Sequence, residues 1–517
     1  MYVTNVPIEL AFTGQGEDAE VEVIFADKDG VEWRVPAFWA GGVDYRVRFA
    51  APSAGRYTYR TPDGQTGELE VAPYDGENSL YQHGRLRVAA NRRTLEHADG
   101  TPFFWLGDTW WMGLTKRLDW PDGFEMLTAD RVAKGFNLVQ IVAGPLPNFQ
   151  AETESWHPMQ ANEAGWSWEE GWARINPAFY DAADRRIAYL VENDIVPCIV
   201  GMWSFYIGFM GVEKGKKHWR NLVARYGAYP VVWCIAGEVK LPPYSQLGVE
   251  GALAEAAVFQ TEVWNDVGRY IRAIDSYHNP ITAHPWEIEG ARVALGGNDL
   301  LDVDMLQTGH GDHSVLKRTV EAIDAANVRE PRMPVINGEP SYEGIMGTAW
   351  QEQQRFLFWG SILSGSAGHT YGAQGIWQMS TREEPYSQDW GEGFWREAMN
   401  YPGSNQVGLG RRFLERYPWW QFEPRNEPEV EKLGRISSFA AGIPEKVWMF
   451  YLVGNWASNE LVGVRGLTIQ IDASYRAFFF NPRSGEEVEV GTVNPGLWPM
   501  PSRPTMEDWL LVLEATQ

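Results

Sequence analysis

The chain has 517 residues, of which 44% are hydrophobic and 22% are charged, and its formal net charge is −24. This length and balance predict two or three globular domains with ample core-forming material. The negative charge argues against a nucleic-acid partner and against binding to an anionic membrane surface, because both would be repelled.

Residues 1–80 alternate apolar and polar positions between turn signals, as in "EVEVIFADKDGVEWRV" and "DYRVRFAAPSAGRYTYR". Short alternating strands with glycine-containing turns every 8–12 residues are typical of a small antiparallel β-sandwich. Residues 81–92 are interpreted as a connector that opens the second block.

Residues 81–422 change to short apolar strands that alternate with long helical stretches. Eight such units predict a (β/α)8 TIM barrel. A doubly wound open sheet is the competing architecture, but no glycine-rich phosphate loop follows any of the strands. The predicted strands are 103–107, 137–144, 196–203, 231–238, 281–287, 301–308, 334–340 and 367–373.

Residues 423–517 return to β patterning, with segments such as "KVWMFYLVGN" and "YRAFFFNPRSGEEVEV". This block predicts a second small β-sandwich, so the expected fold is an α/β barrel flanked by two antiparallel sandwiches.

The C-terminal ends of barrel strands converge on one mouth, where barrel enzymes carry their reactive groups. The candidate site residues are therefore those at or just after the predicted strand ends. They are Asp108, Trp110, Trp111, Gln140, Trp203, Glu238, His284, Gln307, His310, Glu339, His369 and Tyr371.

Two glutamates stand out in this set, Glu238 at the end of strand four and Glu339 at the end of strand seven. Two carboxyl groups on either side of a glycosidic bond can hydrolyse it: one protonates the leaving oxygen, and the other attacks the anomeric carbon or activates water. The alternative is that each glutamate only pairs with a basic residue on the rim.

Five motifs within residues 90–420 resemble the apiosidase-like family of glycoside hydrolases. They are "TPFFWLGDTWW", "RVAKGFNLVQIV", "NPAFYDAADRRIAYLVENDIVPCIVGMW", "RYGAYPVVWCIAGE" and "PVINGEPSYEG". The flanking β blocks are similar to the N-terminal sandwich and C-terminal β domain that often accompany that barrel.

The resemblance implies a retaining, exo-acting glycosidase with Glu238 as acid/base and Glu339 as nucleophile. The sequence departs from the family where an Asp after Gly-Gly is frequent, because it has Glu238 after Ala236 and Gly237. No cofactor and no metal are implied, since the two carboxyl groups supply the chemistry.

The other candidates each have a plainer interpretation. Asp108 could hold two sugar hydroxyls or cap the next helix, and Trp110 and Trp111 beside it favour the site. His284 and His369 could bind a hydroxyl or orient a carboxylate. Tyr371 could donate a hydrogen bond to the strand-seven nucleophile and keep it ionised.

The stretch "TGHGDH" (308–313) invites a metal interpretation, because it brings two histidines and an aspartate together. No distant ligand motif supports it, so contact of His310 with sugar, or a polar loop, is favoured. The long segment 145–180, with Trp156, Trp166, Trp168 and Trp172, is expected to form a wall of the pocket or to pack on its own aromatic rings.

The remaining features concern compartment and assembly. Cys198 and Cys234 lie in apolar stretches, which favours buried free thiols. The N-terminus shows no signal peptide, which predicts a cytoplasmic location, and no window approaches the roughly 20 apolar residues of a membrane span. The sequence leaves a homo-oligomer open.

The function expected from the sequence is that of a glycosidase acting on a carbohydrate substrate, and the 26 tryptophans suit ring-shaped ligands. Two rivals stay open: an endo-β-glycanase with an open cleft, and a carbohydrate-binding barrel without catalysis.

Overall fold

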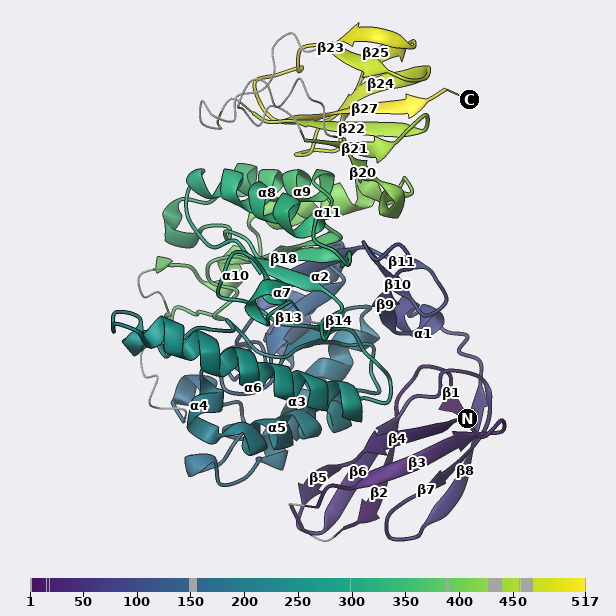
Figure 1. The fold of residues 1–517 in the computed structure, drawn as a ribbon, viewed down its shortest axis with the longest axis vertical. Helices are drawn as coiled ribbons and strands as arrows, with labels where there is room; N and C mark the ends of the chain where they lie inside the picture. The colour runs from purple at the N-terminus through teal and green to yellow at the C-terminus, as the bar shows by residue number, and fades with distance from the viewer. Residues whose placement is uncertain are drawn as a thin grey trace.

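The computed structural model describes residues 2–14, 16–17, 19–147, 156–297, 299–386, 390–425, 439–454, 456 and 468–516. Along the long axis of the molecule, N-terminal sheets are followed by a central barrel with its helices and then by C-terminal sheets (Figure 1). No helix in these ranges is both long and apolar enough to cross a membrane.

The N-terminal sheets face each other and share an aromatic core. Phe25 from one sheet stacks on Phe49 from the other, with ring centroids 4.0 Å apart. β1 pairs with β8 in parallel, a departure from the antiparallel expectation, because the chain passes directly from β1 into the second sheet instead of turning back. The first sheet is β1 (Tyr2–Val3), β8 (Thr66–Ala72), β7 (Gly55–Arg60), β3 (Glu22–Asp27) and β4 (Glu32–Pro36), and the second is β2 (Ile8–Thr13), β6 (Asp44–Phe49) and β5 (Phe38–Gly41).

The expected connector is more ordered than the sequence indicated. It begins with the short helix α1 (Ser79–His83), whose first turn is capped by the side chain of Asn78. A three-stranded sheet follows, in which β10 (Leu95–His97) lies between β9 (Leu86–Val88) and β11 (Pro102–Phe103). These strands are too short to produce a recognisable alternation in the sequence.

The barrel has the eight parallel strands that the sequence predicts, in the order β16-β15-β14-β13-β12-β19-β18-β17. Backbone hydrogen bonds close it, because the amides of Asp302 and Val303 donate to the carbonyl of Ile281 at 2.8 and 3.3 Å. The strands are β12 (Trp105–Trp110), β13 (Leu138–Val142), β14 (Val196–Val200), β15 (Val232–Cys234), β16 (Ile281–Thr282), β17 (Asp304–Gln307), β18 (Val335–Glu339) and β19 (Gly368–Tyr371).

Helices surround the barrel (Figure 1). α3 shows why they form: Asn176 caps it, Pro177 occupies its first position, and one side is apolar and buried. The helices are α2 (Asp122–Lys134), α3 (Pro177–Glu192), α4 (Tyr206–Met210), α5 (Val212–Tyr226), α6 (Ala252–Ile274), α7 (Ala291–Ala294), α8 (Ser314–Asn327), α9 (Gln351–Leu363), α10 (Trp395–Ala398) and α11 (Pro402–Leu414). Single 3₁₀ turns are η1 (Pro158–Gln160), η2 (Glu170–Trp172), η3 (Tyr244–Gln246), η4 (Ile345–Gly347) and η6 (Trp419–Gln421).

The C-terminal sheets rest on helix α9 of the barrel. Arg355 of α9 binds both carboxylate oxygens of Asp508 at 2.7 Å, and both side chains are buried. Such a bidentate pair fixes the orientation of the sheets. The larger sheet is β20 (Glu423–Pro424), β21 (Phe439–Ile443), β22 (Val447–Leu452), β27 (Trp509–Ala515), β24 (Tyr475–Phe480) and β25 (Glu487–Val493), and the smaller is β23 (Thr468–Ile471) with β26 (Gly496–Pro499).

Candidate active site

A cavity of about 390 Å³ lies at the C-terminal ends of the barrel strands. Six of the residues expected from the sequence line it: Trp111, Trp203, Glu238, Gln307, His310 and Glu339. The other described residues in its wall are Pro147, Tyr244, Leu247, Trp286, Gly309, Tyr342, Ile345, Trp377 and Trp390. The wall is therefore aromatic, and the acidic and amide groups are confined to one part of it.

Glu238 follows β15 on a tightly turned backbone with a φ of 47°. The preceding residue must be glycine, because a Cβ at position 237 would lie 2.2 Å from the ring of Trp203. The Glu238 carboxylate accepts hydrogen bonds from Trp203 Nε1 at 3.0 Å and from the Tyr244 hydroxyl at 2.7 Å, both on Oε2. The turn thus directs the carboxylate into the cavity and holds it there.

Glu339 is the last residue of β18, and only 6% of its surface is exposed. Gly338 before it leaves room for Met305, whose sulfur would be 2.5 Å from a Cβ at that position. Two imidazoles face the carboxylate: His284 Nε2 lies 3.1 Å from Oε2, and His310 Nε2 lies 3.0 Å from Oε1.

The two glutamates have pKa values shifted in opposite directions. Burial raises the pKa of Glu238, and the nearby charge of Glu339 adds to this, against hydrogen bonds from Gln307 and Tyr244. Burial alone would also raise the pKa of Glu339, but hydrogen bonds and positive charge from His284 and His310 outweigh it and hold that pKa below its usual range. The site therefore favours a protonated Glu238 beside an ionised Glu339.

Gln307 lies between the two acids. Its Nε2 is 3.0 Å from Glu238 Oε1 and 3.2 Å from Glu339 Oε1. A β-bulge between Leu306 and Gln307 shifts the register of β17, so that Gln307 pairs with Glu339 and not with Gly338. The bulge is what brings the amide to the level of both carboxylates.

His284, at the end of the fifth strand segment, contacts both glutamates. The backbone N–H of Glu238 donates to its Nδ1 at 3.4 Å, and its Nε2 faces Glu339. Trp111 packs edge-on against the ring with centroids 5.2 Å apart. His284 is completely buried, so its ring is held in this orientation.

Asp108 and Trp110 lie outside the cavity, contrary to the sugar-binding role expected for them. Asp108 is fully buried and accepts hydrogen bonds from Arg131 Nε at 2.6 Å and from Trp110 Nε1 at 2.8 Å. Trp110 packs edge-on against Phe124 of α2. Both side chains therefore point outward, between β12 and its helix, and Asp108 does not cap α2, whose N-cap is Pro121.

Three further candidates also lie behind the cavity. Gln140 donates to the backbone carbonyl of Gly338 at 2.8 Å, one residue before the strand-seven acid. Tyr371 was expected to bond that acid, but its hydroxyl donates to Glu343 at 2.6 Å, because its side chain points to the outer face of β19. His369 points the same way, packs edge-on against Phe358, and burial lowers its pKa to about 3.

Several lining residues were missed by sequence reasoning because they lie on loops beyond the strand ends. Tyr244 is six positions after Glu238, in η3, where no strand alternation points to it. Trp286 lies beyond β16, which ends at Thr282, but inside the predicted strand 281–287, and could have been found there. Trp377 and Trp390 lie in the long connection after β19, where the abundance of tryptophan was the only signal.

The tryptophans of the long segment 145–180 pack on one another and on helices α4 and α5. Trp156 and Trp172 have ring centroids 5.1 Å apart, and Trp168 donates to His218 at 3.1 Å. These tryptophans and Trp166 are not among the described lining residues of the cavity, which favours the alternative that they pack on other aromatic rings, whereas Pro147 of the same segment does line it. Residues 148–155 lie outside the described part.

The "TGHGDH" residues diverge and do not form a cluster. His310 faces Glu339, Asp312 accepts from the amide of Ser314 at 2.9 Å, and the His313 ring lies 5.2 Å from Trp456. Within the described ranges, no three His, Cys, Asp or Glu side chains are placed to hold a metal ion. Both cysteines are buried and free, as expected.

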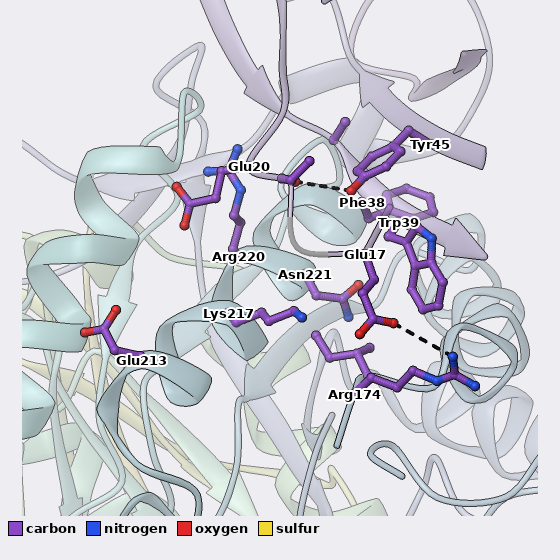
Figure 2. Close-up of a pocket in the computed structure, with 13 residues that line it drawn as sticks. Glu17, Glu20, Phe38, Trp39, Tyr45, Arg174, Glu213, Lys217, Arg220 and Asn221 are labelled. Carbon is purple, nitrogen blue, oxygen red and sulfur yellow. Dashed lines mark hydrogen bonds and ion pairs between the residues drawn. The ribbon is translucent and has the colours of Figure 1, made fainter. Parts of the chain in front are cut away.

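A second cavity of about 200 Å³ lies between the N-terminal sheets and helix α5 (Figure 2). Two arginines of its wall have partners: Arg174 pairs with Glu17 at 3.9 Å and with Glu169, outside the wall, at 2.6 Å, and Arg220 donates to the Val21 carbonyl at 2.9 Å. We interpret this cavity as part of the interface between the N-terminal sandwich and the barrel.

Comparison with known proteins agrees with this fold. A solved glycoside hydrolase has 22% sequence identity, covers 84% of this chain and 98% of its own, and superimposes with a TM-score of 0.66. A family 5 glycoside hydrolase from Bacteroides vulgatus ATCC 8482 gives 22% identity, 84% and 94% coverage, and a TM-score of 0.68. A putative glycoside hydrolase from the same organism has 16% sequence identity, covers 99% of this chain and 99% of its own, and superimposes with a TM-score of 0.73. At these identities the likeness establishes the fold, and no curated protein matches the sequence.

The barrel and its site define a glycoside hydrolase. The family description "Apiosidase-like, catalytic domain" matches residues 89–421, and a domain of unknown function, DUF5060, matches residues 6–63. The chain belongs to the apiosidase-like family, and its substrate is a carbohydrate.

Proposed function

We propose that the protein is a retaining, exo-acting glycosidase in which Glu339 is the nucleophile and Glu238 the acid/base. The observation that carries this proposal is that two carboxylates meet at one cavity in different surroundings: Glu339 faces two histidines, whereas Glu238 is bonded by Trp203 and Tyr244, and these surroundings shift the two pKa values in opposite directions. A protonated acid and an ionised carboxylate are the two states that the first step requires at once.

The reaction would proceed in two displacements. Glu339 forms a bond to the anomeric carbon while the bond to the leaving oxygen breaks, and Glu238 gives its proton to that oxygen. Glu238, now ionised, takes a proton from water, and the resulting hydroxide attacks the glycosyl ester and releases Glu339. His284 and His310 keep Glu339 ionised at the start of the cycle.

The spacing of the two acids supports retention. Their Oε1 atoms are bonded to the same Gln307 nitrogen, so these oxygens are at most about 6.2 Å apart, the sum of the two distances. Inverting enzymes leave about 6.5–9.5 Å for a water, whereas retaining enzymes hold their carboxyl groups about 5–5.5 Å apart.

The shape of the cavity supports removal of a terminal sugar. At about 390 Å³ it lies near the small end of the range for ligand pockets, and tryptophans from several loops wall it in. An apiose-type furanose is the first candidate from the family, with other furanoses and pyranoses to be compared. Trp111, Trp203, Gln307 and His310, which line the cavity, would contact this sugar.

A panel of 4-nitrophenyl furanosides and pyranosides of both anomers tests the proposal with wild type and Glu339→Ala. We expect one glycoside to be cleaved by wild type alone, and proton NMR to show that the first product keeps the anomeric configuration. Initial release of the opposite anomer would contradict retention. Equal cleavage by the Glu339→Ala variant would contradict the assigned nucleophile.

A further inference from the structure

Three of the residues that line the cavity carry large apolar or aromatic side chains and lie on the two loops that follow the strands of Glu238 and His284: Tyr244, Leu247 and Trp286. Tyr244 begins η3 and bonds the acid directly, and Leu247 follows at the end of the same turn. Trp286 is linked to the same loop, because its backbone N–H donates to the carbonyl of Val239, the residue after Glu238, at 3.1 Å. All three residues line the same cavity as the proposed proton donor, and Tyr244 bonds it directly.

Two of these side chains are unusually open for their type. Leu247 is 37% exposed and Trp286 is 38% exposed, although both belong to the wall of a concave site. Large apolar side chains exposed together at a cavity are characteristic of a surface that a ligand covers.

Few polar groups are available there to recognise hydroxyl or carboxylate groups. The Tyr244 hydroxyl is bonded to Glu238, and Gln307, which donates to both acids, is the residue proposed above to contact the terminal sugar. Among the described lining residues there is no lysine or arginine. Lys240, two residues from the acid, is paired with Glu287 at 3.1 Å.

We infer that Tyr244, Leu247 and Trp286 form a subsite for the leaving group, and that this group is an apolar aglycone, an aryl or alkyl alcohol, and not a second sugar or a uronate. The inference rests on the proposed function, because the proton from Glu238 must reach the oxygen of the departing group. A sugar in this position would lose water from several hydroxyls without gaining partners for them, whereas an aryl or alkyl group gains by burial.

Methyl, n-butyl and n-octyl glycosides of the sugar identified by the chromogenic panel test this subsite, because their leaving groups differ mainly in length. We expect kcat/KM to rise about two- to fourfold for each methylene over the first few carbons. Leu247→Asn and Trp286→Gln should each lower the octyl-to-methyl ratio of kcat/KM at least fivefold. Leu253→Asn is the matched control, since Leu253 is 45% exposed on α6 and does not line the cavity.

Equal kcat/KM values for the methyl, n-butyl and n-octyl glycosides would overturn the subsite. A higher kcat/KM for a disaccharide of the same sugar than for its octyl glycoside would also overturn it. Calorimetric titration with 2-naphthol provides a readout that does not need catalysis. We expect binding with a negative heat-capacity change that weakens at least fivefold in Leu247→Asn and not in Leu253→Asn. Naphthol binding without hydrolysis of any glycoside would count against the proposed function and retain the subsite; absent or variant-independent binding would overturn the subsite.

Discussion

Glu238 and Glu339 share one hydrogen-bond donor, the side-chain nitrogen of Gln307, which lies 3.0 Å from the first carboxylate and 3.2 Å from the second. Two buried carboxylates this close cannot both be ionised without strong repulsion. The environment breaks the symmetry, since two histidines face Glu339, whereas Glu238 is surrounded by Trp203, Tyr244 and the shared amide. The two acids are therefore held in different protonation states.

The first prediction concerns the pH dependence of kcat/KM. Because the pKa of Glu238 is raised, its proton is retained above the value of about 4.3 of an ordinary glutamate, and activity should fall only when pH rises through that higher pKa. The lowered pKa of Glu339 places the acidic limb below the usual range. A rate profile from pH 3 to pH 10 with a 4-nitrophenyl glycoside measures the basic limb, and activity should persist at its acidic end, below the pKa of an ordinary glutamate.

Glu238→Gln supplies the control for this assignment. With a 2,4-dinitrophenyl glycoside, whose leaving group needs no proton, the first step should continue in the variant, and its rate should no longer decline at high pH. A basic limb that survives unchanged in Glu238→Gln would show that another group carries it.

The second prediction concerns Gln307→Met, which keeps the length of the side chain and removes the shared donor. The Gln307 hydrogen bond lowers the pKa of Glu238, so its loss should move the basic limb to higher pH. Loss of a hydrogen bond to a charged group costs about 1.5–3 kcal/mol, which predicts a fall in kcat/KM of roughly 10- to 100-fold.

Gln354→Met is the matched control, because this buried amide on α9 donates to the Ser341 carbonyl at 2.9 Å and does not touch either acid. It should leave the basic limb where it is in wild type. An equal shift in both variants would mean that general loosening of the barrel, and not the shared donor, sets the pKa of Glu238.

The third prediction separates the roles of the two acids by rescue with azide. Glu339→Ala should lose on the order of 10⁴-fold or more of its activity, and azide in the vacated space should attack the sugar directly, giving a glycosyl azide of inverted configuration. Glu238→Ala should lose about 10²–10⁴-fold, and azide should attack the glycosyl–Glu339 ester, giving the retained configuration. NMR of the two glycosyl azides identifies their anomeric configurations. A retained azide from Glu339→Ala and an inverted azide from Glu238→Ala would mean that Glu238 is the nucleophile and Glu339 the acid/base.

The strand ends could be located from the sequence because buried parallel strands form continuous apolar runs bounded by polar residues. Glu238 and Glu339 were found in this way, and so were Trp203, Gln307 and His310. The β-bulge that orients Gln307 could not be predicted, because it shifts the strand register by one residue without a recognisable signal in the sequence.

The direction of each side chain was harder to predict than the position of its strand. Asp108 and Trp110 point outward to α2, whereas Trp111, one residue later, lines the cavity. Side chains alternate along a strand, so an error of one residue in the predicted strand end places a side chain in the cavity when it in fact faces the helix layer. His369 also points outward, to Phe358 of α9, in agreement with this alternation.

The fourth prediction follows from the outward direction of Asp108. Asp108→Asn would leave Arg131 buried with a weakened partner, and breaking a buried ion pair costs about 3–5 kcal/mol. We expect a clear fall in the thermal midpoint with KM changed less than twofold. Asp130→Asn, which removes a partly exposed carboxylate from the same arginine, should cost much less. A large rise in KM without loss of stability would restore the sugar-binding role for Asp108.

The last prediction concerns His218, a buried histidine of α5 whose Nε2 lies 2.8 Å from the Gly201 carbonyl and whose Nδ1 accepts from Trp168. Burial lowers its pKa to about 4, although the bond to Gly201 opposes this. The folded-state pKa is below the unfolded value of about 6.5, so the stability it confers is complete above pH 6.5 and is lost as pH falls toward 4.

The shift corresponds to about 3 kcal/mol of unfolding free energy lost between pH 7 and pH 4. Urea unfolding followed by tryptophan fluorescence should show this loss in wild type and a shallower one in His218→Gln, which cannot titrate. His278→Gln removes an exposed histidine and should keep the wild-type dependence. If His218→Gln kept the full slope, protonation of His218 would not be what loosens the contact between α5 and the Trp168 segment at low pH.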